Sequence, residues 1–147
     1  GVVYQNPDYQ LFMQTVEKEI KFGAKSDEYA DEIAEKFGIK HLYARHPQSL
    51  SEGQKRRVSI AAVVATDPEV LILDEPTVGQ DYKGLCEMVE VLNKLHEEAH
   101  NTMITVTHDK RCAAALCDKS VWIKNGKTYK TGGKELVDEF FIQIGVN

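Results

Sequence analysis

The pattern of apolar and polar positions predicts strands separated by amphipathic helices. Short apolar runs with β-branched residues lie at residues 2–5, 70–73, 103–107 and 121–123. Such runs are typical of strands, whereas apolar residues spaced three or four positions apart are typical of helices. The alternation of strands and helices predicts an α/β fold with a parallel sheet and right-handed crossover connections.

The strand at residues 70–73 is the centre of this organisation. It contains no polar residue, so we expect it to be buried on both faces of the sheet, and we expect the strand at residues 103–107 to be a second buried strand. Asp74 and Glu75 follow at once, and Pro76 ends the strand. Ligands in open α/β sheets bind outside the carboxyl ends of the strands. The two acids are therefore candidates for chemistry.

Apolar stripes and capping residues delimit the helices. Helical spacing is present at residues 11–20, 27–37, 52–65 and 85–95, and shorter helices are predicted through Cys117 and from Lys134. Ser26 is a plausible N-terminal cap for the second helix, and Gly38 is a plausible C-terminal cap. A turn is predicted at Asn125-Gly126, after the last strand.

The third predicted helix has two candidate N-terminal caps. Ser49 with Glu52, and Ser51 with Gln54, both match the capping-box pattern. Gly53 in the first turn costs stability, so we expect another group to approach its backbone closely. A serine, a glycine and free N–H groups at the start of a helix are typical of a phosphate site.

Composition narrows the class of protein. The 147 residues suit one domain or a large piece of a bigger one, and 42% hydrophobic and 28% charged residues are ordinary for a globular protein. The net charge of −5 argues against a broad nucleic-acid surface. No apolar run is long enough to span a bilayer, and no signal-peptide pattern is present. The chain begins with Gly1, so we expect a fragment.

These features occur in the order found in the nucleotide-binding subunits of ABC transporters, and the chain resembles that family from the glutamine loop onward. The matching parts are Gln5 (glutamine loop), Leu50–Gln54 (signature motif), Leu71–Glu75 (Walker B), Thr77–Asp81 (D-loop) and His108 (switch histidine). Residues 5–12 and 15–17 most resemble the energy-coupling-factor ATPases of cobalt and vitamin uptake. The resemblance implies a P-loop NTPase (RecA-like) parallel sheet with an inserted α-helical signature subdomain.

The resemblance also implies ATP and Mg²⁺ as cofactors and a role for each motif residue. Asp74 and Gln5 are expected to hold Mg²⁺, Glu75 to act as general base toward water, and Gln5 and His108 to contact the γ-phosphate. The resemblance also implies that the remaining site residues contact ATP held by a second ATPase subunit, namely Ser51, Gly53, Gln54 and Asp81.

The same resemblance implies a domain plan and partners. The expected parts are a glutamine-loop strand and loop (1–10), a helical signature subdomain (11–66), a RecA-like core segment (67–133) and a C-terminal helix (134–147). Transmembrane transporter subunits are expected to dock on residues 11–43, so the parent protein would be cytoplasmic and peripheral on the inner face of the membrane. Its expected function is ATP-driven import of a metal ion or vitamin, without nucleic acid.

Two departures from the family pattern stand out. The sequence contains no G-x-x-x-x-G-K-[ST], so the Walker A half that cradles the phosphates is absent and we expect the fragment alone to be inactive. Gln80 stands where the family usually has leucine. The alternatives are a non-catalytic half-domain or docking module and a soluble ABC ATPase of translation or DNA repair. The latter lacks support because residues 5–17 resemble importers and no coiled-coil insertion is present.

Two further segments have plain interpretations. His96-Glu97-Glu98-Ala99-His100 matches the H-E-x-x-H zinc pattern, but it is the polar end of an amphipathic helix and no third ligand follows convincingly, so we expect no structural zinc. The basic run Lys55-Arg56-Arg57 is interpreted as the solvated, phosphate-proximal face of the signature helix rather than as a nucleic-acid patch.

Overall fold

The structure is a computed structural model that describes residues 1–99 and 101–145. Two compact units divide the chain, Gly1–Val106 and Thr107–Asn147, and each is described by itself. Among the described helices, none is long and apolar enough to cross a membrane. The finer division expected from the sequence, with boundaries after residues 10, 66 and 133, stays a prediction.

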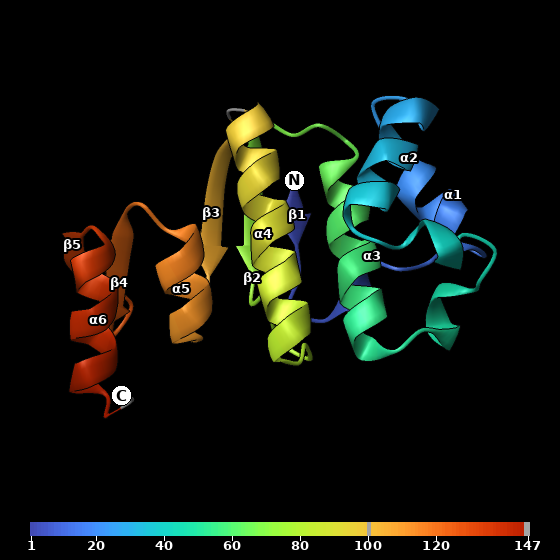
Figure 1. Cartoon of the computed structure of the whole chain (residues 1–147). Helices are drawn as coiled ribbons and strands as arrows, with labels where there is room; N and C mark the ends of the chain where they lie inside the picture. The colour runs from blue at the N-terminus through green and yellow to red at the C-terminus, as the bar shows by residue number, and fades with distance from the viewer. Residues whose placement is uncertain (100, 146–147) are drawn as a thin grey trace. The chain divides into compact units, whose positions relative to one another are not determined.

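The first unit is built on three parallel strands in the order β1-β2-β3, shown in Figure 1. These are β1 (Val2–Val3), β2 (Val70–Asp74) and β3 (Thr102–Val106). Val3 lies opposite Leu73, and Leu73 lies opposite Thr105. The α/β class with a parallel sheet is therefore confirmed, and the residues after β1 and β2 leave the sheet at the same edge.

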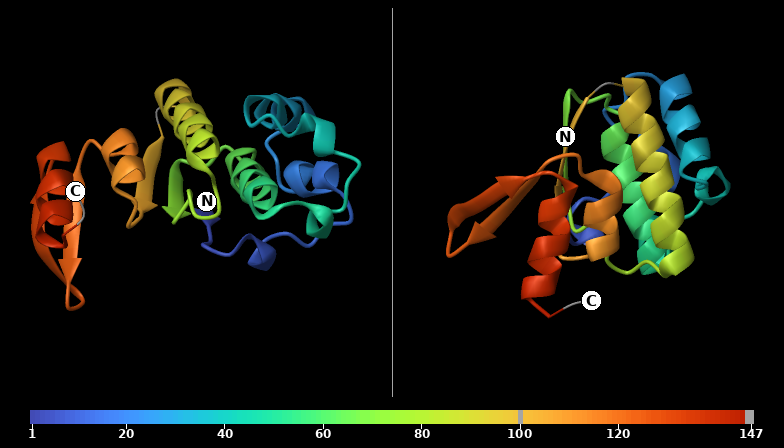
Figure 2. Two further views of the ribbon diagram at one scale, coloured as in Figure 1. Left: turned by 60° about the horizontal axis from the view of Figure 1, so that its bottom comes forward. Right: turned by 60° about the vertical axis from the view of Figure 1, so that its left-hand side comes forward.

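Two helices cover one face of this sheet, α3 (Glu52–Val64) and α4 (Tyr82–Ala99), as Figures 1 and 2 show. The apolar stripe predicted for α4 is buried, since Leu85, Met88, Val89, Leu92 and Leu95 are all at most 8% exposed. Leu71 and Leu73 are also buried. One part of the core of the first unit thus lies between the strands and these two helices, and another part lies in the helical segment, where Ile20, Ile33 and Phe37 are at most 2% exposed.

The expectation that β2 is buried on both faces, and that β3 is a buried strand, is wrong for the described chain. Val70, Ile104 and Val106 are 43%, 47% and 54% exposed. Successive side chains of a strand point to opposite faces, and the described helices cover one face only. Near-continuous apolar runs such as these are nevertheless typical of strands that are covered on both faces.

The helical part of the first unit precedes α3. Its elements are η1 (Pro7–Tyr9), α1 (Val16–Lys21), α2 (Asp27–Lys36), η2 (Lys40–Leu42) and η3 (Pro47–Ser49). The predicted limits of α2 are confirmed. The Ser26 hydroxyl accepts from the Tyr29 amide at 3.1 Å, and Gly38 follows the helix with φ +65°.

The first predicted helix, at residues 11–20, begins later in the structure, as α1. Thr15 caps α1, and Phe12 lies before the helix with 67% of its surface exposed rather than on an apolar face. The buried Glu19 carboxylate explains this difference. It accepts from the backbone amides of Phe12 and Met13 at 2.9 and 2.7 Å, so these N–H groups are satisfied without a helix.

The second unit is a small α/β arrangement. It contains α5 (Lys110–Leu116), an antiparallel hairpin of β4 (Ser120–Lys124) and β5 (Lys127–Gly132), and α6 (Lys134–Gln143). The predicted turn is confirmed by positive φ angles of 51° at Asn125 and 72° at Gly126. Strand β5 was not predicted, although an Asn-Gly turn after a strand is a strong hairpin signal.

Candidate functional site

Glu75 marks the point where the chain leaves the sheet. Its amide still donates to the Val106 carbonyl at 2.8 Å, as a further residue of β2 would. Its φ is +49°, in the left-handed region that costs a non-glycine residue roughly 1–2 kcal/mol. Local strain of this kind clusters at functional sites. The backbone therefore turns sharply at the residue that the sequence nominates as general base.

Gln5 follows β1 at the same edge of the sheet as Asp74 and Glu75. The loop after β1 is held by Gln10, which sequence reasoning missed. The Gln10 amide oxygen accepts from the Tyr4 amide at 2.9 Å, and its nitrogen donates to the Val2 carbonyl at 3.1 Å. Gln10 thus replaces a neighbouring strand along the free edge of β1, while Gln5 itself stays exposed.

The basic run of α3 is not solvated, which corrects the expectation from the sequence. Lys55 and Arg56 are only 7% and 3% exposed. The Arg56 guanidinium donates to the backbone carbonyls of Tyr4, at 2.9 Å, and Gln5. The Lys55 ammonium pairs with Asp8 at 2.9 Å. These two cations fasten the signature helix to the glutamine loop, and a sequence offers no clear sign of such a contact between distant segments.

Arg56 also lies within electrostatic range of the two acids after β2. Burial lowers the pKa of Arg56, and the negative charges of Glu52, Asp74 and Glu75 oppose that change. Arginine stays protonated in proteins because its ordinary pKa is so high. A buried positive charge is therefore present within electrostatic range of both candidate catalytic carboxylates and in contact with the backbone of Gln5.

Of the two candidate caps for α3, the Ser51–Gln54 pair forms the capping box. The Ser51 hydroxyl accepts from the Gln54 amide at 3.3 Å, and the Gln54 side-chain oxygen accepts from the Ser51 amide at 3.1 Å. Ser49 instead donates to the His46 carbonyl at 2.7 Å. A hydroxyl that accepts through a lone pair can still donate its hydrogen, so exposed Ser51 can cap the helix and bind a phosphate oxygen.

The close approach predicted at Gly53 is confirmed, and the approaching group is the side chain of Gln80. Its amide nitrogen donates to the Gly53 carbonyl at 3.0 Å. A Cβ at Gly53 would lie 3.4 Å from the same amide group. The next residue, Asp81, is exposed, and its carboxylate accepts from the Gly84 amide at 2.7 Å at the start of α4. The D-loop therefore contacts the signature helix directly.

His108 belongs to the second unit and is described there only. It is exposed between β3 and α5. The flanking residues are well fixed, since the Asp109 amide donates to the Thr107 hydroxyl at 3.1 Å and the Asp109 carboxylate accepts from the Arg111 amide at 2.8 Å. The Arg111 guanidinium lowers the pKa of Asp109. The role of His108 toward a nucleotide stays a prediction.

The oxygen ligands at the edge of the sheet fit Mg²⁺. Mg²⁺ is bound in proteins by one or two carboxylates together with water and substrate phosphates. Asp74 offers such a carboxylate, Gln5 offers an amide oxygen from the neighbouring strand end, and no hydrogen bond within the described residues holds the Asp74 side chain. In residues 1–99 and 101–145, histidine, cysteine and acidic side chains form no group of three that could hold a metal ion.

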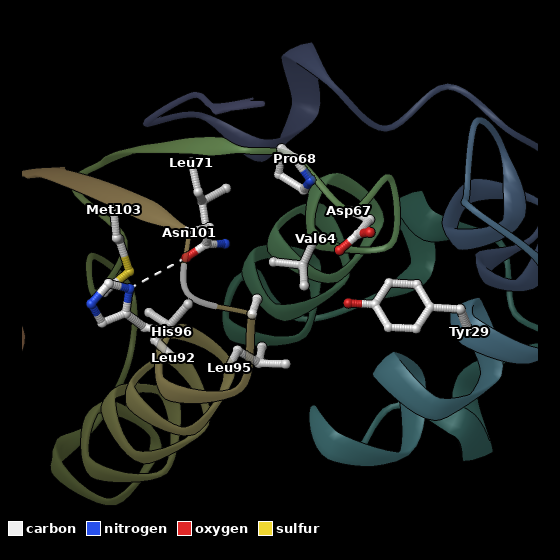
Figure 3. Close-up of a pocket in the computed structure, with 11 residues that line it drawn as sticks. Tyr29, Val64, Asp67, Pro68, Leu71, Leu92, Leu95, His96, Asn101 and Met103 are labelled. Atoms are coloured by element: carbon white, nitrogen blue, oxygen red, sulfur yellow. Dashed lines mark hydrogen bonds between the residues drawn. The ribbon is translucent and has the colours of Figure 1, made fainter.

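The pocket drawn in Figure 3 lies at the amino ends of the strands, away from these acids. Pro68, Asn101 and Met103 contribute to its lining, and His96 Nδ1 lies 3.3 Å from Asn101 Oδ1. It has room for about one water molecule, so it is no nucleotide site. His96 is also the first histidine of the H-E-x-x-H match, whose second histidine, His100, lies outside the described residues.

Comparison with known proteins supports the resemblance seen in the sequence. The ABC transporter family matches residues 1–78. The energy-coupling factor transporter ATP-binding protein EcfA2 of Enterococcus faecalis is 43% identical in an alignment 146 positions long, which covers 93% of this chain and 50% of the relative. A putative ABC transporter ATP-binding protein of Methanopyrus kandleri is 44% identical in an alignment 143 positions long, which covers 92% of this chain and 53% of the relative.

Solved structures show the same fold. CbiO1 from Clostridium perfringens, part of the ABC transporter complex cbiONQ, superposes with a TM-score of 0.80 at 34% identity, covering 98% of this chain and 62% of that chain. A dimeric ATP-binding cassette, MJ0796, bound to ADP and Pi, gives a TM-score of 0.80 at 26% identity over 91% of this chain and 62% of that chain. The chain spans about half the length of the curated relatives it matches. It belongs to the ABC transporter family and has the fold of that family's ATPase domains.

Proposed function

We propose that this chain is part of an energy-coupling-factor type ATPase, from the glutamine loop onward. The complete protein would hydrolyse ATP to drive import. The observation that carries the proposal is the register of β1 beside β2, with Gln5, Asp74 and Glu75 leaving the sheet at one edge. Such an edge is where ligands bind in open α/β sheets. The similarity to proteins named as energy-coupling factor ATP-binding subunits supports the importer type.

Each candidate residue has a distinct task. The Glu75 carboxylate accepts a proton from the water that attacks the γ-phosphate, and the positive φ of Glu75 marks a sharp turn of the backbone at this residue. Asp74 and Gln5 would hold Mg²⁺, which would supply positive charge to the phosphoryl oxygens. His108 donates a hydrogen bond to the γ-phosphate. Arg56 fixes the Gln5 backbone, so the glutamine side chain starts from a defined position.

The signature helix serves the nucleotide of a second ATPase subunit. Ser51 is exposed and keeps a hydrogen to donate, and the amides at the first turn of α3 favour an anion. Gln54 holds Ser51 in place through the capping box, and Asp81 contacts the second subunit beside it. In this arrangement a phosphate would lie between two subunits, each of which completes the other's site.

The transmembrane subunits of the transporter would dock on the helical part of the first unit, which places the whole protein on the inner face of the membrane. Aromatic side chains near residues 11–43 support this assignment. Tyr9, Phe12 and Phe22 are 80%, 67% and 58% exposed, and the rings of Phe12 and Phe22 contact each other with centroids 5.3 Å apart. Exposed aromatic clusters mark interaction sites. The transported solute would be a metal ion or vitamin.

The direct test is ATP turnover by the full-length protein with Mg²⁺, compared with this chain alone. The full-length protein is expected to hydrolyse ATP, and the chain alone is expected to be inactive because it contains no phosphate-cradling loop. Asp74→Asn should abolish turnover in the full-length protein. If the isolated chain hydrolyses ATP and Glu75→Gln abolishes this turnover, the phosphate-cradling loop is not required. If the full-length protein is inactive, the result favours a non-catalytic docking module.

The docking surface has its own test, which is capture of the transmembrane subunits from detergent-solubilised membranes. Phe12→Ser with Phe22→Ser is expected to prevent capture without loss of ATP binding, because both side chains are exposed and support no core. Tyr129→Ser, an exposed aromatic position of the second unit, is the matched control. Equal capture by the double variant and the control would remove the docking assignment.

A further inference from the structure

The D-loop of this chain packs on the first turn of the signature helix. Gly79 has φ +80°, and a Cβ at this position would lie 3.7 Å from the Cβ of Glu52. The adjacent Gln80 donates to the Gly53 carbonyl at 3.0 Å. A Cβ at Gly84 would lie 2.5 Å from the Gln80 side-chain oxygen. The glutamine amide is thus enclosed between a glycine of α3 and a glycine of α4.

The contact with the Gly53 carbonyl requires the side-chain amide donor of glutamine and not only a side chain of that size. A carbonyl oxygen has two lone pairs, so the Gly53 carbonyl can accept from Gln80 as well as from its own helix. Leucine, the residue usual at this position in the family pattern, could fill the same space but has no donor. The contact between D-loop and signature helix is therefore more directional here than apolar packing alone provides.

We propose that Gln80 is a positioning residue that holds the D-loop and the signature helix together, so that Ser51 and Asp81 meet the second subunit as one rigid surface. The proposal rests on the proposed function, in which both residues act across the dimer. Groups that are fixed relative to each other before association lose less freedom on binding. Without the Gln80 hydrogen bond, Ser51 and Asp81 would have to be fixed relative to each other when the two subunits associate. The dimer would therefore be weaker, although neither Ser51 nor Asp81 is itself changed.

The test compares Gln80→Met with the parent protein in full-length Glu75→Gln, which is expected to trap the ATP-bound dimer because hydrolysis is blocked. Methionine keeps the length of glutamine and removes the donor. ATP-driven dimerisation, measured by sedimentation with Mg²⁺ and ATP, is expected to weaken about two- to tenfold, the range for loss of one hydrogen bond. In the Glu75-containing protein, kcat should fall while the KM for ATP stays within about twofold, because Gln80 acts on closure rather than on nucleotide binding.

Gln143→Met is the matched control, because Gln143 is exposed at the end of α6 and belongs to no proposed site. It should leave dimerisation and kcat unchanged. If the Gln80→Met and Gln80→Leu variants dimerise with ATP as strongly as the parent and the control do, the positioning role is overturned. This holds even if the melting temperature of the variants falls. A parent protein that binds ATP but never dimerises would instead contradict the proposed function, so the two failures are distinguishable.

Discussion

Arg56 on the signature helix donates a hydrogen bond to the backbone carbonyl of Gln5 in the glutamine loop. The same guanidinium donates to the Tyr4 carbonyl at 2.9 Å and is 3% exposed. Two segments that are far apart in the sequence and belong to different functional motifs are thus joined by one buried side chain. A change at the γ-phosphate that moves Gln5 would be transmitted to α3 through this contact.

Arg56→Met should destabilise the full-length protein and reduce ATP turnover together. The variant leaves the Tyr4 and Gln5 carbonyls without their donor, and hydrogen bonds from charged groups contribute about 1.5–3 kcal/mol each. We expect the free energy of unfolding in urea to fall by roughly 2–4 kcal/mol, given that such contributions are not fully additive.

Arg57→Met is the control for this prediction. Arg57 is the next residue of α3 and pairs with Glu87 at 2.6 Å in a partly exposed ion pair. Exposed pairs contribute about 0–1 kcal/mol, so this variant should lose little stability and keep its turnover. Equal losses in the two variants would show that the contact of Arg56 with the glutamine loop has no special weight.

Glu75→Gln in the full-length protein should stop hydrolysis and leave ATP binding intact. Glutamine keeps the size of the side chain and adds no strain at φ +49°, but it cannot accept the proton of the attacking water. General bases contribute on the order of 10²–10⁴ in rate. Turnover and nucleotide affinity should be measured on one preparation, and a variant with lost affinity but normal turnover would refute the role of Glu75 as base.

Glu19→Ala should destabilise the protein more than Glu19→Gln. Alanine leaves the amides of Phe12 and Met13 without their acceptor, at a cost of about 1–3 kcal/mol. Glutamine retains an oxygen that can accept from both. Urea unfolding of the full-length variants at neutral pH measures the difference, and equal stability would mean that water replaces the carboxylate at these amides.

Glu19 also predicts a dependence of stability on pH. Burial raises the pKa of Glu19 above its ordinary 4.5, although its two backbone hydrogen bonds partly oppose the shift. The folded protein therefore binds more protons than the unfolded chain between the two pKa values. Relative to Glu19→Gln, the wild type should lose stability as the pH rises from 4.5 through the raised pKa. The opposite slope would show that the hydrogen bonds outweigh burial.

The fold and the order of the site residues could be predicted because they depend on local signals. Apolar runs define β2 and β3, Ser26 and Gly38 define α2, and the acids after β2 sit where strands of such sheets present ligands. These signals need no knowledge of which segments meet. Strand β5 was missed because its side chains are almost all exposed and lack an apolar pattern.

The contacts between distant segments could not be predicted in the same way. The burial of Arg56 follows from the position of the glutamine loop over α3, and a basic run alone is usually solvated. Gly53 did signal a close approach, but only the structure identifies Gln80 as the group that approaches. Whether a face of the sheet is exposed depends on the elements that cover it. The apolar pattern of a strand does not contain this information.

The most direct test of the account is the effect of Ser51→Asp on ATP-driven dimerisation of the full-length protein. Aspartate is a competent cap for α3, so the melting temperature should stay close to that of the wild type. Its carboxylate should repel the γ-phosphate held by the second subunit. We therefore predict that the variant binds ATP but neither dimerises nor hydrolyses it, whereas Ser49→Asp, at an exposed serine outside the capping box, behaves as wild type. ATP-driven dimerisation that survives Ser51→Asp would reduce Ser51 to a helix cap and contradict the proposed role of the signature helix.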